Sequence, residues 1–391
     1  MNSAATLPEH AVNLVETTFQ PEGEVERVAA PTRVCFVIDR LSRAGTESQL
    51  LLLIRKLDRT RVMPYLVLLD GHDEQSRLLM PTDCSTLALG VRRLTSLQAL
   101  LQARTFYRLL RRERIDVVQT YFPDSTRYAA PIAKAAGVRL VFGARRNIGH
   151  WVTRRDRWLG RLYNRWFIDK IVANCEAARK AVIEQEGAKP AQVVVLPNLI
   201  DLDRFRGISP WTPKPAGTLR RVGMVGNLRP VKGVDLFIRA AAEVIREFPR
   251  TEFAIAGGGD ATPYSSLIKE LGIADRVSLL GPVDDVPAFL ATLDVAVLPS
   301  RAEGLSNSLL EYMAAGRPIV ATDVGQTSAV LEGAARDCCV APEDIAALTQ
   351  GILRWFKSPE AARRCAQSLA SRAKEASGWD AANKLYHTGE G

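Results

Sequence analysis

The sequence predicts an α/β protein built from two doubly wound parallel sheets. Short apolar segments alternate with amphipathic segments of helix length along most of the chain, which is the pattern of parallel strands covered by helices. Glycine-containing loops follow several of these segments, at the position where open α/β sheets bind ligands. A chain of 391 residues exceeds the usual size of one domain, so two domains are expected.

The predicted elements of the first half precede a stretch rich in helix and strand breakers. Strands are predicted at residues 33–38, 64–69, 116–120, 138–142, 168–173 and 193–196. Helices are predicted at residues 48–57, 97–112 and 125–136. The segment SPWTPKPAG at 209–217 indicates a linker. We therefore expect a first domain at 31–208 and a linker at 209–219.

The second half repeats the alternation of strand and helix. Strands are predicted at residues 221–225, 252–256, 277–280, 294–298 and 318–322. One helix is predicted to begin at Val234. Another is predicted to end at Gly316, because the apolar residues at helical spacing stop at this glycine. These elements predict a second domain at 220–375, with a final helix in residues 376–391.

Composition excludes several classes of protein. Hydrophobic residues make up 47% of the chain and charged residues 24%, which is typical of a folded protein with an ample core. No apolar run of membrane-spanning length occurs, and residues 1–30 lack the basic and apolar regions of a signal peptide, so we expect a flexible arm there. The six cysteines lack metal-binding spacing, which favours a reducing, cytoplasmic compartment.

The net charge of +9 is concentrated in the first domain. Residues 31–200 contain 29 Lys and Arg against 15 Asp and Glu, whereas residues 201–391 contain 22 against 23. Arginines at helical spacing form two rows: Arg104, Arg108 and Arg111, and Arg157, Arg161 and Arg165. Trp158 and Trp166 accompany the second row, and basic helices with aromatic residues suit an anionic membrane surface. A solvated face over a packed aromatic side is the alternative. No nucleic-acid-binding motif is present, so no nucleic-acid partner is expected.

The stretch from residue 300 to residue 316 holds the candidate ligand site. It follows a predicted buried strand, and Ser306 and Asn307 offer N-cap side chains to the helix behind them. Free amides at a helix N-terminus favour phosphate. Glu303 in the loop and Glu311 on the helix add carboxylates, which accept hydrogen bonds from sugar hydroxyls. Solvated loop and helix positions are the alternative for these two residues.

Two further loops offer charged or titratable groups. The segment GNLRPVKG at 226–233 places Arg229 and Lys232 at a strand-to-helix junction, where cations can neutralise a leaving diphosphate. After the strand at 138–142, Arg145 is a candidate anion contact and His150 a candidate general base, although a lone histidine is more often a surface or core residue.

Two further segments show weaker patterns. The loop with Gly45 and Thr46 follows the first strand, but it is not a dinucleotide-binding motif. Asp201 and Asp203 are interpreted as turn residues rather than a metal site.

Two of these segments, in this order and separation, carry a family resemblance: GNLRPVKG at 226–233 and EGLSNSLLE at 303–311. The chain resembles the retaining glycosyltransferase family 4, whose members have the GT-B fold. AGTE at 44–47 resembles that family's glycine-rich acceptor-side loop, and PNLIDLDRF at 197–205 resembles its interdomain segment. The resemblance extends over roughly residues 33–386 and implies two Rossmann-like domains facing across a cleft.

The resemblance also implies roles for single residues. Arg229 and Lys232 would bind the diphosphate, Glu303 would contact the donor sugar, and Glu311 would bind the ribose. The remaining implied donor contacts are the loop and helix start Gly304, Leu305, Ser306 and Asn307, the base-side turn at Val283, and the acceptor-side Gly45 and Thr46. No metal cofactor is implied, and the last helix would return to the first domain.

Three positions depart from the family pattern. Asn227 stands where many members have arginine, and Leu199 follows Pro-Asn where glycine is usual. Many members also have a histidine soon after the fifth strand, where this chain has Arg145. Whether His150 or Arg145 fills that place stays open at this stage.

We therefore expect a cytoplasmic, metal-independent, retaining glycosyltransferase that uses a UDP- or GDP-sugar. Its acceptor would be a lipid-linked or saccharide hydroxyl in cell-surface polysaccharide or glycolipid assembly, with peripheral contact to an anionic membrane. A non-catalytic nucleotide-sugar-binding or scaffold protein is the alternative, as is another GT-B enzyme such as an epimerase or phosphorylase.

Overall fold

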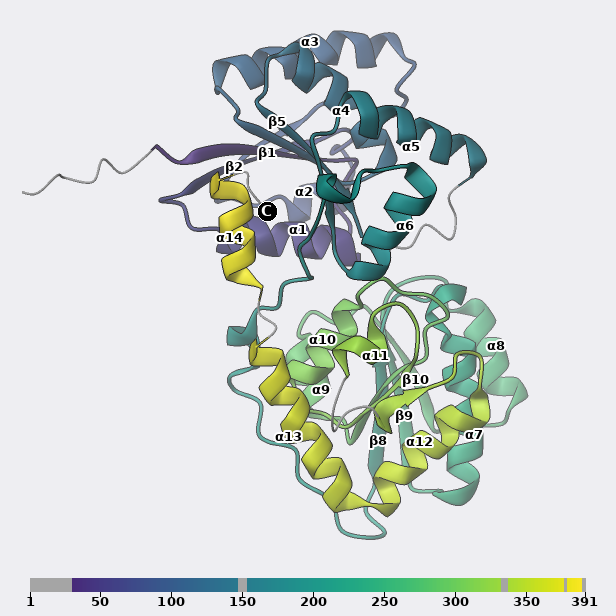
Figure 1. The fold of residues 1–391 in the computed structure, drawn as a ribbon. Helices are drawn as coiled ribbons and strands as arrows, with labels where there is room; N and C mark the ends of the chain where they lie inside the picture. The colour runs from purple at the N-terminus through teal and green to yellow at the C-terminus, as the bar shows by residue number, and fades with distance from the viewer. Residues whose placement is uncertain (1–29, 147–152, 332–336, 376–377, 389–391) are drawn as a thin grey trace, which may run out of the picture. The chain divides into compact units, whose positions relative to one another are not determined.

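The computed structural model describes residues 30–146, 153–331, 337–375 and 378–388. These residues form two parallel β-sheets with their covering helices (Figure 1). The prediction of an α/β protein with two parallel sheets is confirmed. The arm predicted for residues 1–30 lies outside the described residues except for Ala30.

The first sheet has seven strands in the order β3-β2-β1-β4-β5-β6-β7, and every pairing is parallel. The strands are β1 (Thr32–Ile38), β2 (Val62–Leu68), β3 (Ser85–Ala88), β4 (Val117–Thr120), β5 (Leu140–Arg145), β6 (Lys170–Ala173) and β7 (Val193–Val195). The strand order reverses between β1 and β4. Ligands of open sheets bind at the carboxyl ends of the strands beside such a reversal.

Helices cover both faces of this sheet. They are α1 (Gly45–Lys56), α2 (Glu74–Leu79), α3 (Leu97–Arg112), α4 (Pro123–Ala135), α5 (Arg154–Trp166) and α6 (Glu176–Glu186), with short 3-10 turns at Pro190–Gln192 and Leu202–Phe205. One face packs Ile54 of α1 against Phe36. The other face packs Phe106 of α3 and Val182 of α6 with Val118.

The second sheet has six strands in the order β10-β9-β8-β11-β12-β13, again with parallel pairings. The strands are β8 (Arg220–Val225), β9 (Thr251–Ala256), β10 (Val277–Gly281), β11 (Val295–Leu298), β12 (Ile319–Thr322) and β13 (Cys339–Val340). The helices are α7 (Val234–Glu247), α8 (Thr262–Glu270), α9 (Val286–Ala291), α10 (Asn307–Ala314), α11 (Thr327–Val330), α12 (Ile345–Lys357) and α13 (Pro359–Glu375), with a 3-10 turn η3 (Pro230–Lys232).

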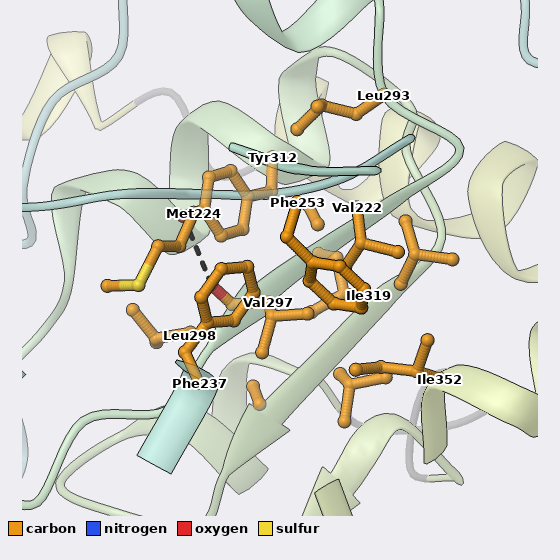
Figure 2. Close-up of a cluster of buried hydrophobic side chains, with 14 of the residues drawn as sticks. Val222, Met224, Phe237, Phe253, Leu293, Val297, Leu298, Tyr312, Ile319 and Ile352 are labelled. Atoms are coloured by element: carbon orange, nitrogen blue, oxygen red, sulfur yellow. Dashed lines mark hydrogen bonds between the residues drawn. The ribbon is translucent and has the colours of Figure 1, made fainter. Parts of the chain in front are cut away.

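Figure 2 shows how the second core fixes α10. The buried Tyr312 ring lies among Met224, Phe237 and other apolar side chains. Its hydroxyl accepts a hydrogen bond from Val225 N at 2.6 Å and donates to Val297 O at 3.3 Å. The tyrosine thus connects α10 with β8 and β11, the strands that lead into the candidate loops.

Strands β3 and β13 were not predicted. β3 has four residues, of which Ser85 is exposed and the others are only partly buried, so it lacks the apolar run that marks an inner strand. β13 has two residues, which is too short for a periodic signal. Both strands occupy a sheet edge.

The segment 209–219 forms no helix or strand, yet it is not free of the second domain. Trp211 is buried in the second core, and its indole Nε1 donates to Asp294 O at 3.0 Å. Lys214 forms an ion pair with the carboxylate of Asp294 at 2.7 Å.

The last described helix, α14 (Trp379–Thr388), packs on the first sheet. Tyr386 is buried with its ring centroid 5.5 Å from that of Phe36, and its hydroxyl donates to Gln119 Oε1 at 2.7 Å. The preceding helix α13 belongs to the second core, so the chain returns to the first domain after it.

Candidate active site

Lys232 and Glu303, predicted from separate motifs, form an ion pair. Lys232 ends the turn η3 behind β8, and Glu303 lies in the loop behind β11. Lys232 Nζ donates to Glu303 Oε1 at 2.6 Å, and Ser300 Oγ donates to the same oxygen at 2.8 Å. The Glu303 side chain is nearly buried at 11% exposure, whereas the Lys232 side chain is more open at 26%.

The Lys232 turn is fixed by close backbone packing. Gly233 has a φ of 64°, and a Cβ there would lie 2.0 Å from Pro299 O, so only glycine fits. Arg301 Nη1 donates to Pro230 O at 2.6 Å and pairs with Asp235 at 2.7 Å. These contacts hold the turn that carries Lys232 against the loop that carries Glu303.

Arg229, the second predicted cation of this motif, is exposed. Within the part of the chain that the structure describes, its guanidinium makes no hydrogen bond or ion pair. Its side chain is therefore not held by protein groups, unlike that of Lys232.

The loop at residues 303–305 is held from two sides. Gly304 O accepts a hydrogen bond from Gln326 N at 3.0 Å, and Leu305 O accepts one from Asn198 Nδ2 at 2.8 Å. A Cβ on Gly325, whose φ is 60°, would lie 2.3 Å from Glu303 O. The neighbouring backbone therefore sets the shape of this loop.

Helix α10 begins at Asn307, next to the two predicted N-cap residues, but the predicted side-chain caps are wrong. Ser306 occupies the N-cap position without a side-chain capping bond, and its buried Oγ has no hydrogen-bond partner among the described residues. Asn307 turns instead to the first domain, where its Nδ2 donates to Gly45 O at 3.0 Å. The first turn of α10 thus lacks side-chain caps and keeps amides for a ligand.

Asn198, which follows β7, joins the first-domain strand ends to this helix start. Its Nδ2 donates to Asn307 Oδ1 at 2.6 Å as well as to Leu305 O. Its Oδ1 accepts from Arg146 Nη2 at 2.6 Å and from Asn174 Nδ2 at 3.2 Å. The sequence places Asn198 in the interdomain segment PNLIDLDRF at 197–205 but does not predict that its side chain links these elements.

The two arginines behind β5 have different partners. Arg145 pairs with Glu186 at 2.7 Å, and its Nη2 donates to Asn164 Oδ1 at 3.4 Å. Arg146 points to Asn198, and burial lowers the pKa of its guanidinium. No carboxylate among the described residues pairs with Arg146. His150 lies outside the described residues.

Two carboxyl groups have raised pKa values. Burial raises the pKa of Glu311 to about 7, with Arg204 opposing that shift, and the carboxyl makes no hydrogen bond within the described part of the chain. Burial also raises the pKa of Asp39 to about 6, although its carboxylate accepts from Ser125 N at 2.9 Å. Asp39 follows β1 at the strand-order reversal, and it was not among the predicted site residues.

The remaining predicted residues lie in neighbouring loops. Val283 is partly buried against the second core, and Asp284 beside it pairs with Arg43 at 2.6 Å. Thr46 is half-buried at the start of α1, next to the exposed Gly45.

Asp201 and Asp203, which offered the weak metal pattern, both contact Lys56 Nζ, at 3.1 and 3.0 Å. Over the described ranges, no group of three or more His, Cys, Asp or Glu side chains is arranged to hold a metal ion. Metal independence nevertheless stays a prediction.

Two known protein families match this chain. The family described as "Glycosyl transferases group 1" matches residues 220–358, and the "Glycosyl transferase 4-like domain" matches residues 44–199. The chain belongs to the group 1, or family 4, glycosyltransferases. The predicted family is thereby confirmed, and the two matches correspond to the two sheets.

Two relatives of known name match parts of the chain. A D-inositol 3-phosphate glycosyltransferase of Kineococcus radiotolerans is 31% identical over 54% of each chain. An alpha-D-kanosaminyltransferase of Streptomyces kanamyceticus is 34% identical over 37% of this chain and 39% of its own. The chain thus spans about half the length, or less, of these relatives.

The solved structure of Anabaena Alr3699/HepE in complex with UDP and glucose superposes with a TM-score of 0.77. It covers 90% of this chain and 98% of its own, at 18% identity. This likeness confirms the GT-B fold. Of the helices that the structure describes in this glycosyltransferase-family chain, none has the length and hydropathy needed to cross a bilayer.

Proposed function

We propose that this chain transfers a sugar from a nucleoside-diphosphate donor to a hydroxyl acceptor. The observation that carries the proposal is the Lys232–Glu303 pair, at 2.6 Å, beside the uncapped first turn of α10. The cation and the free amides suit the diphosphate, and Glu303 suits the hydroxyls of the donor sugar. Glu311 on the same helix would accept from the ribose.

The donor we favour is a UDP-sugar. The Anabaena HepE structures contain UDP and UDP-glucose, and they share the fold over nearly the whole chain. A GDP-sugar would need the same diphosphate contacts, so the base is the part of this proposal that needs a direct measurement. The turn at Val283 is where we place the base.

We further propose front-face transfer with retention of configuration and without a metal. The acceptor oxygen forms its bond to the anomeric carbon on the face from which the diphosphate leaves, and the acceptor proton passes to a diphosphate oxygen. Lys232 and Arg229 stabilise the charge that develops on the leaving group. We propose that Arg145 or His150 completes the site from the first domain. Inversion at the anomeric carbon, measured by NMR of the product, would overturn this mechanism.

The proposed setting is cytoplasmic, at the inner face of the plasma membrane, in polysaccharide or glycolipid assembly. The acceptor would be a lipid-linked or saccharide hydroxyl. The basic first domain, with 29 Lys and Arg in residues 31–200, supports an anionic surface or carrier on the acceptor side.

A panel of UDP- and GDP-sugars tests the proposal by thermal shift and by release of the nucleotide, with and without EDTA. We expect one nucleotide series to raise the melting temperature and to be turned over, unaffected by EDTA. The absence of any shift would overturn the donor site. Binding with no turnover, whatever the acceptor, would favour a non-catalytic nucleotide-sugar-binding protein, and products other than a glycoside would indicate an epimerase or phosphorylase.

A further inference from the structure

The exposed apolar side chains of this protein are concentrated on two helices. Twelve large hydrophobic residues are exposed in the described ranges, and seven of them lie on α3 and α5. Those on α3 are Leu97, Leu100, Leu101 and Tyr107, and those on α5 are Trp158, Leu162 and Trp166. Scattered exposed apolar residues are ordinary, whereas a concentration of them marks an interaction surface.

On α5 the exposed residues form one stripe. Trp158, Leu162 and Trp166 follow one another at a spacing of four residues, so they share a face of the helix. The two tryptophans are 62% and 63% exposed. Tyr163 and Phe167 supply the inward side, with ring centroids 5.2 Å apart. The outward tryptophans are therefore not the packed aromatic side that the sequence left as an alternative.

Arginines surround these apolar residues. Helix α3 contains four arginines and no acidic residue, and α5 contains five arginines and only Asp156. Asp156 is already held by Arg127 and Thr153. Arg104 and Arg108 on α3 and Arg161 and Arg165 on α5 are exposed. The charge on this surface is thus almost entirely positive.

The two helices belong to the same face of the first sheet, with α4 between them (Figure 1). Tyr128 of α4 donates from its hydroxyl to Ala99 O of α3 at 2.8 Å. On the other side, Tyr163 of α5 donates to Arg127 O of α4 at 3.2 Å. The exposed residues of α3 and α5 therefore form one surface on a single helix layer, which we call the α3–α5 surface.

We propose that the α3–α5 surface docks on an anionic lipid bilayer. Tryptophan and leucine side chains enter the interface between head groups and acyl chains, and the arginines contact anionic head groups. Tryptophan favours this depth because its ring is apolar and its N–H remains hydrated. A protein partner could also cover tryptophan and arginine side chains, and binding to vesicles in the absence of any other protein distinguishes the two partners.

The position of the surface also suits the proposed reaction, on which this choice of partner rests. Helices α3 and α5 each follow the carboxyl end of a strand, so their first turns start from the sheet edge that carries Asp39, Arg146 and Asn198. Leu97, Leu100 and Leu101 lie in the first two turns of α3. A hydroxyl acceptor anchored in the bilayer would thus enter from the edge where the first-domain loops lie.

Sedimentation of the full chain with vesicles tests the proposal. Vesicles of equal phosphatidylcholine and phosphatidylglycerol are compared with phosphatidylcholine alone, at low and at high salt. We expect binding to the anionic vesicles that weakens strongly with salt. Salt-insensitive binding to both kinds of vesicle would overturn the role of the arginines, and no binding at low salt would overturn the proposal.

Matched variants assign the binding to this surface. Trp158→Ser with Trp166→Ser should lower the partition coefficient at least about tenfold, and Arg161→Gln with Arg165→Gln should lower it by about thirtyfold at low salt. Leu219→Ser with Leu280→Ser, exposed in the second domain, should leave it unchanged, as should Arg246→Gln with Arg363→Gln. If the second-domain control variants lowered the partition coefficient as much as the α5 variants, the assignment of binding to the α3–α5 surface would be overturned.

Two further outcomes would replace the bilayer with another partner. A dimer in size-exclusion chromatography that the Trp158→Ser, Trp166→Ser variant dissolves would make the surface a self-interface. Tighter binding to a single-stranded oligonucleotide than to anionic vesicles, lost in the arginine variant, would make it a nucleic-acid surface. All of these measurements are made without donor, so a failed donor screen and a failed docking proposal are distinguishable.

Discussion

In the second domain, three glycines stand where a Cβ would meet the backbone of a neighbouring loop. The distances are 2.0 Å for Gly233, 1.9 Å for Gly257 and 2.3 Å for Gly325. In the first domain, a Cβ on Gly45 would meet only the side chain of Asn307, at 3.1 Å. The donor-side loops are thus shaped by backbone contacts, whereas the acceptor-side strand ends are joined by side chains such as Asn198.

The difference has a consequence for function. A loop held by backbone contacts keeps its amides and Lys232 in the same positions when surface residues around it change. This suits the binding of a diphosphate, the group that nucleotide-sugar donors share. Side-chain links can change with a single substitution, which suits acceptors that differ between enzymes. We therefore expect changes in the second-domain pair to affect turnover, and changes in the first-domain links to affect binding and stability.

The largest effect is expected from Lys232→Ala. The turnover number should fall by about 10²–10³-fold, because the developing charge on the diphosphate loses a cation. The free energy of unfolding should fall by only about 1–3 kcal/mol, since Glu303 loses its partner in a site of partial exposure. Steady-state kinetics and urea unfolding measure the two quantities.

The control is Lys214→Ala, which breaks a lysine–carboxylate pair of similar length, 2.7 Å, in the same domain but outside the site. It should destabilise the fold by a similar amount and leave turnover unchanged. A normal turnover number in folded Lys232→Ala would remove the lysine from the mechanism.

The second effect concerns the link from the first domain. Asn198→Ala removes the acceptor of Arg146 and the donor to Leu305 O, so the free energy of unfolding should fall by about 2 kcal/mol. The donor KM should rise about tenfold, because the loop beside α10 loses one of its two supports. Asn164→Ala, which removes a buried asparagine of the Arg145 cluster, should destabilise similarly without raising the donor KM. Equal KM values for both variants would contradict the comparison.

These two residues also show what the sequence could reveal. Lys232 and Glu303 lie in motifs with a fixed spacing, and the backbone that brings them together depends on glycines visible in the sequence. Asn198 also lies in a segment that resembles the family, but its contacts could not be predicted, because its partners Arg146 and Asn307 are 52 and 109 residues away along the chain. The side-chain caps expected at Ser306 and Asn307 were wrong. Asn307 is not free to cap the helix, because its side-chain amide bonds to Asn198 and to Gly45 O from other loops.

The third effect is a pH dependence from Glu311. Its pKa of about 7 lies above the usual 4.5, so the folded chain keeps a proton that the unfolded chain releases. Stability should therefore fall as the pH rises from about 4.5 to 7. Between pH 5 and pH 8 the wild type should lose about 2–3 kcal/mol more than Glu311→Gln. Asp39 titrates in an overlapping window but is present in both proteins, so the difference isolates Glu311.

Donor binding should show the opposite trend with pH. Ribose hydroxyls donate best to an ionised carboxylate, so donor affinity should rise with pH up to about 7 and then level off. Isothermal titration at pH 6 and pH 8 should show proton release on binding at the lower pH. A flat affinity profile in the wild type, equal to that of Glu311→Gln, would contradict the ribose contact.

The smallest effect on activity is expected at Arg145, because its guanidinium already pairs with Glu186. Of the two candidates proposed for the first-domain side of the site, Arg145 and His150, this pairing favours His150. Arg145→Ala leaves the partly buried Glu186 without its ion-pair partner, with only Asn164 Nδ2 still donating to its carboxylate, and should destabilise the fold by about 2–3 kcal/mol. Arg145→Met with Glu186→Leu removes both charges and should recover most of that loss. Because Arg146, not Arg145, contacts Asn198 and through it the start of α10, the double variant should turn over donor within about threefold of the wild type. If the turnover number fell as far as in Lys232→Ala, Arg145 would instead belong to the reacting centre. The first-domain side of the site would then, like the second-domain side, need a cation for turnover.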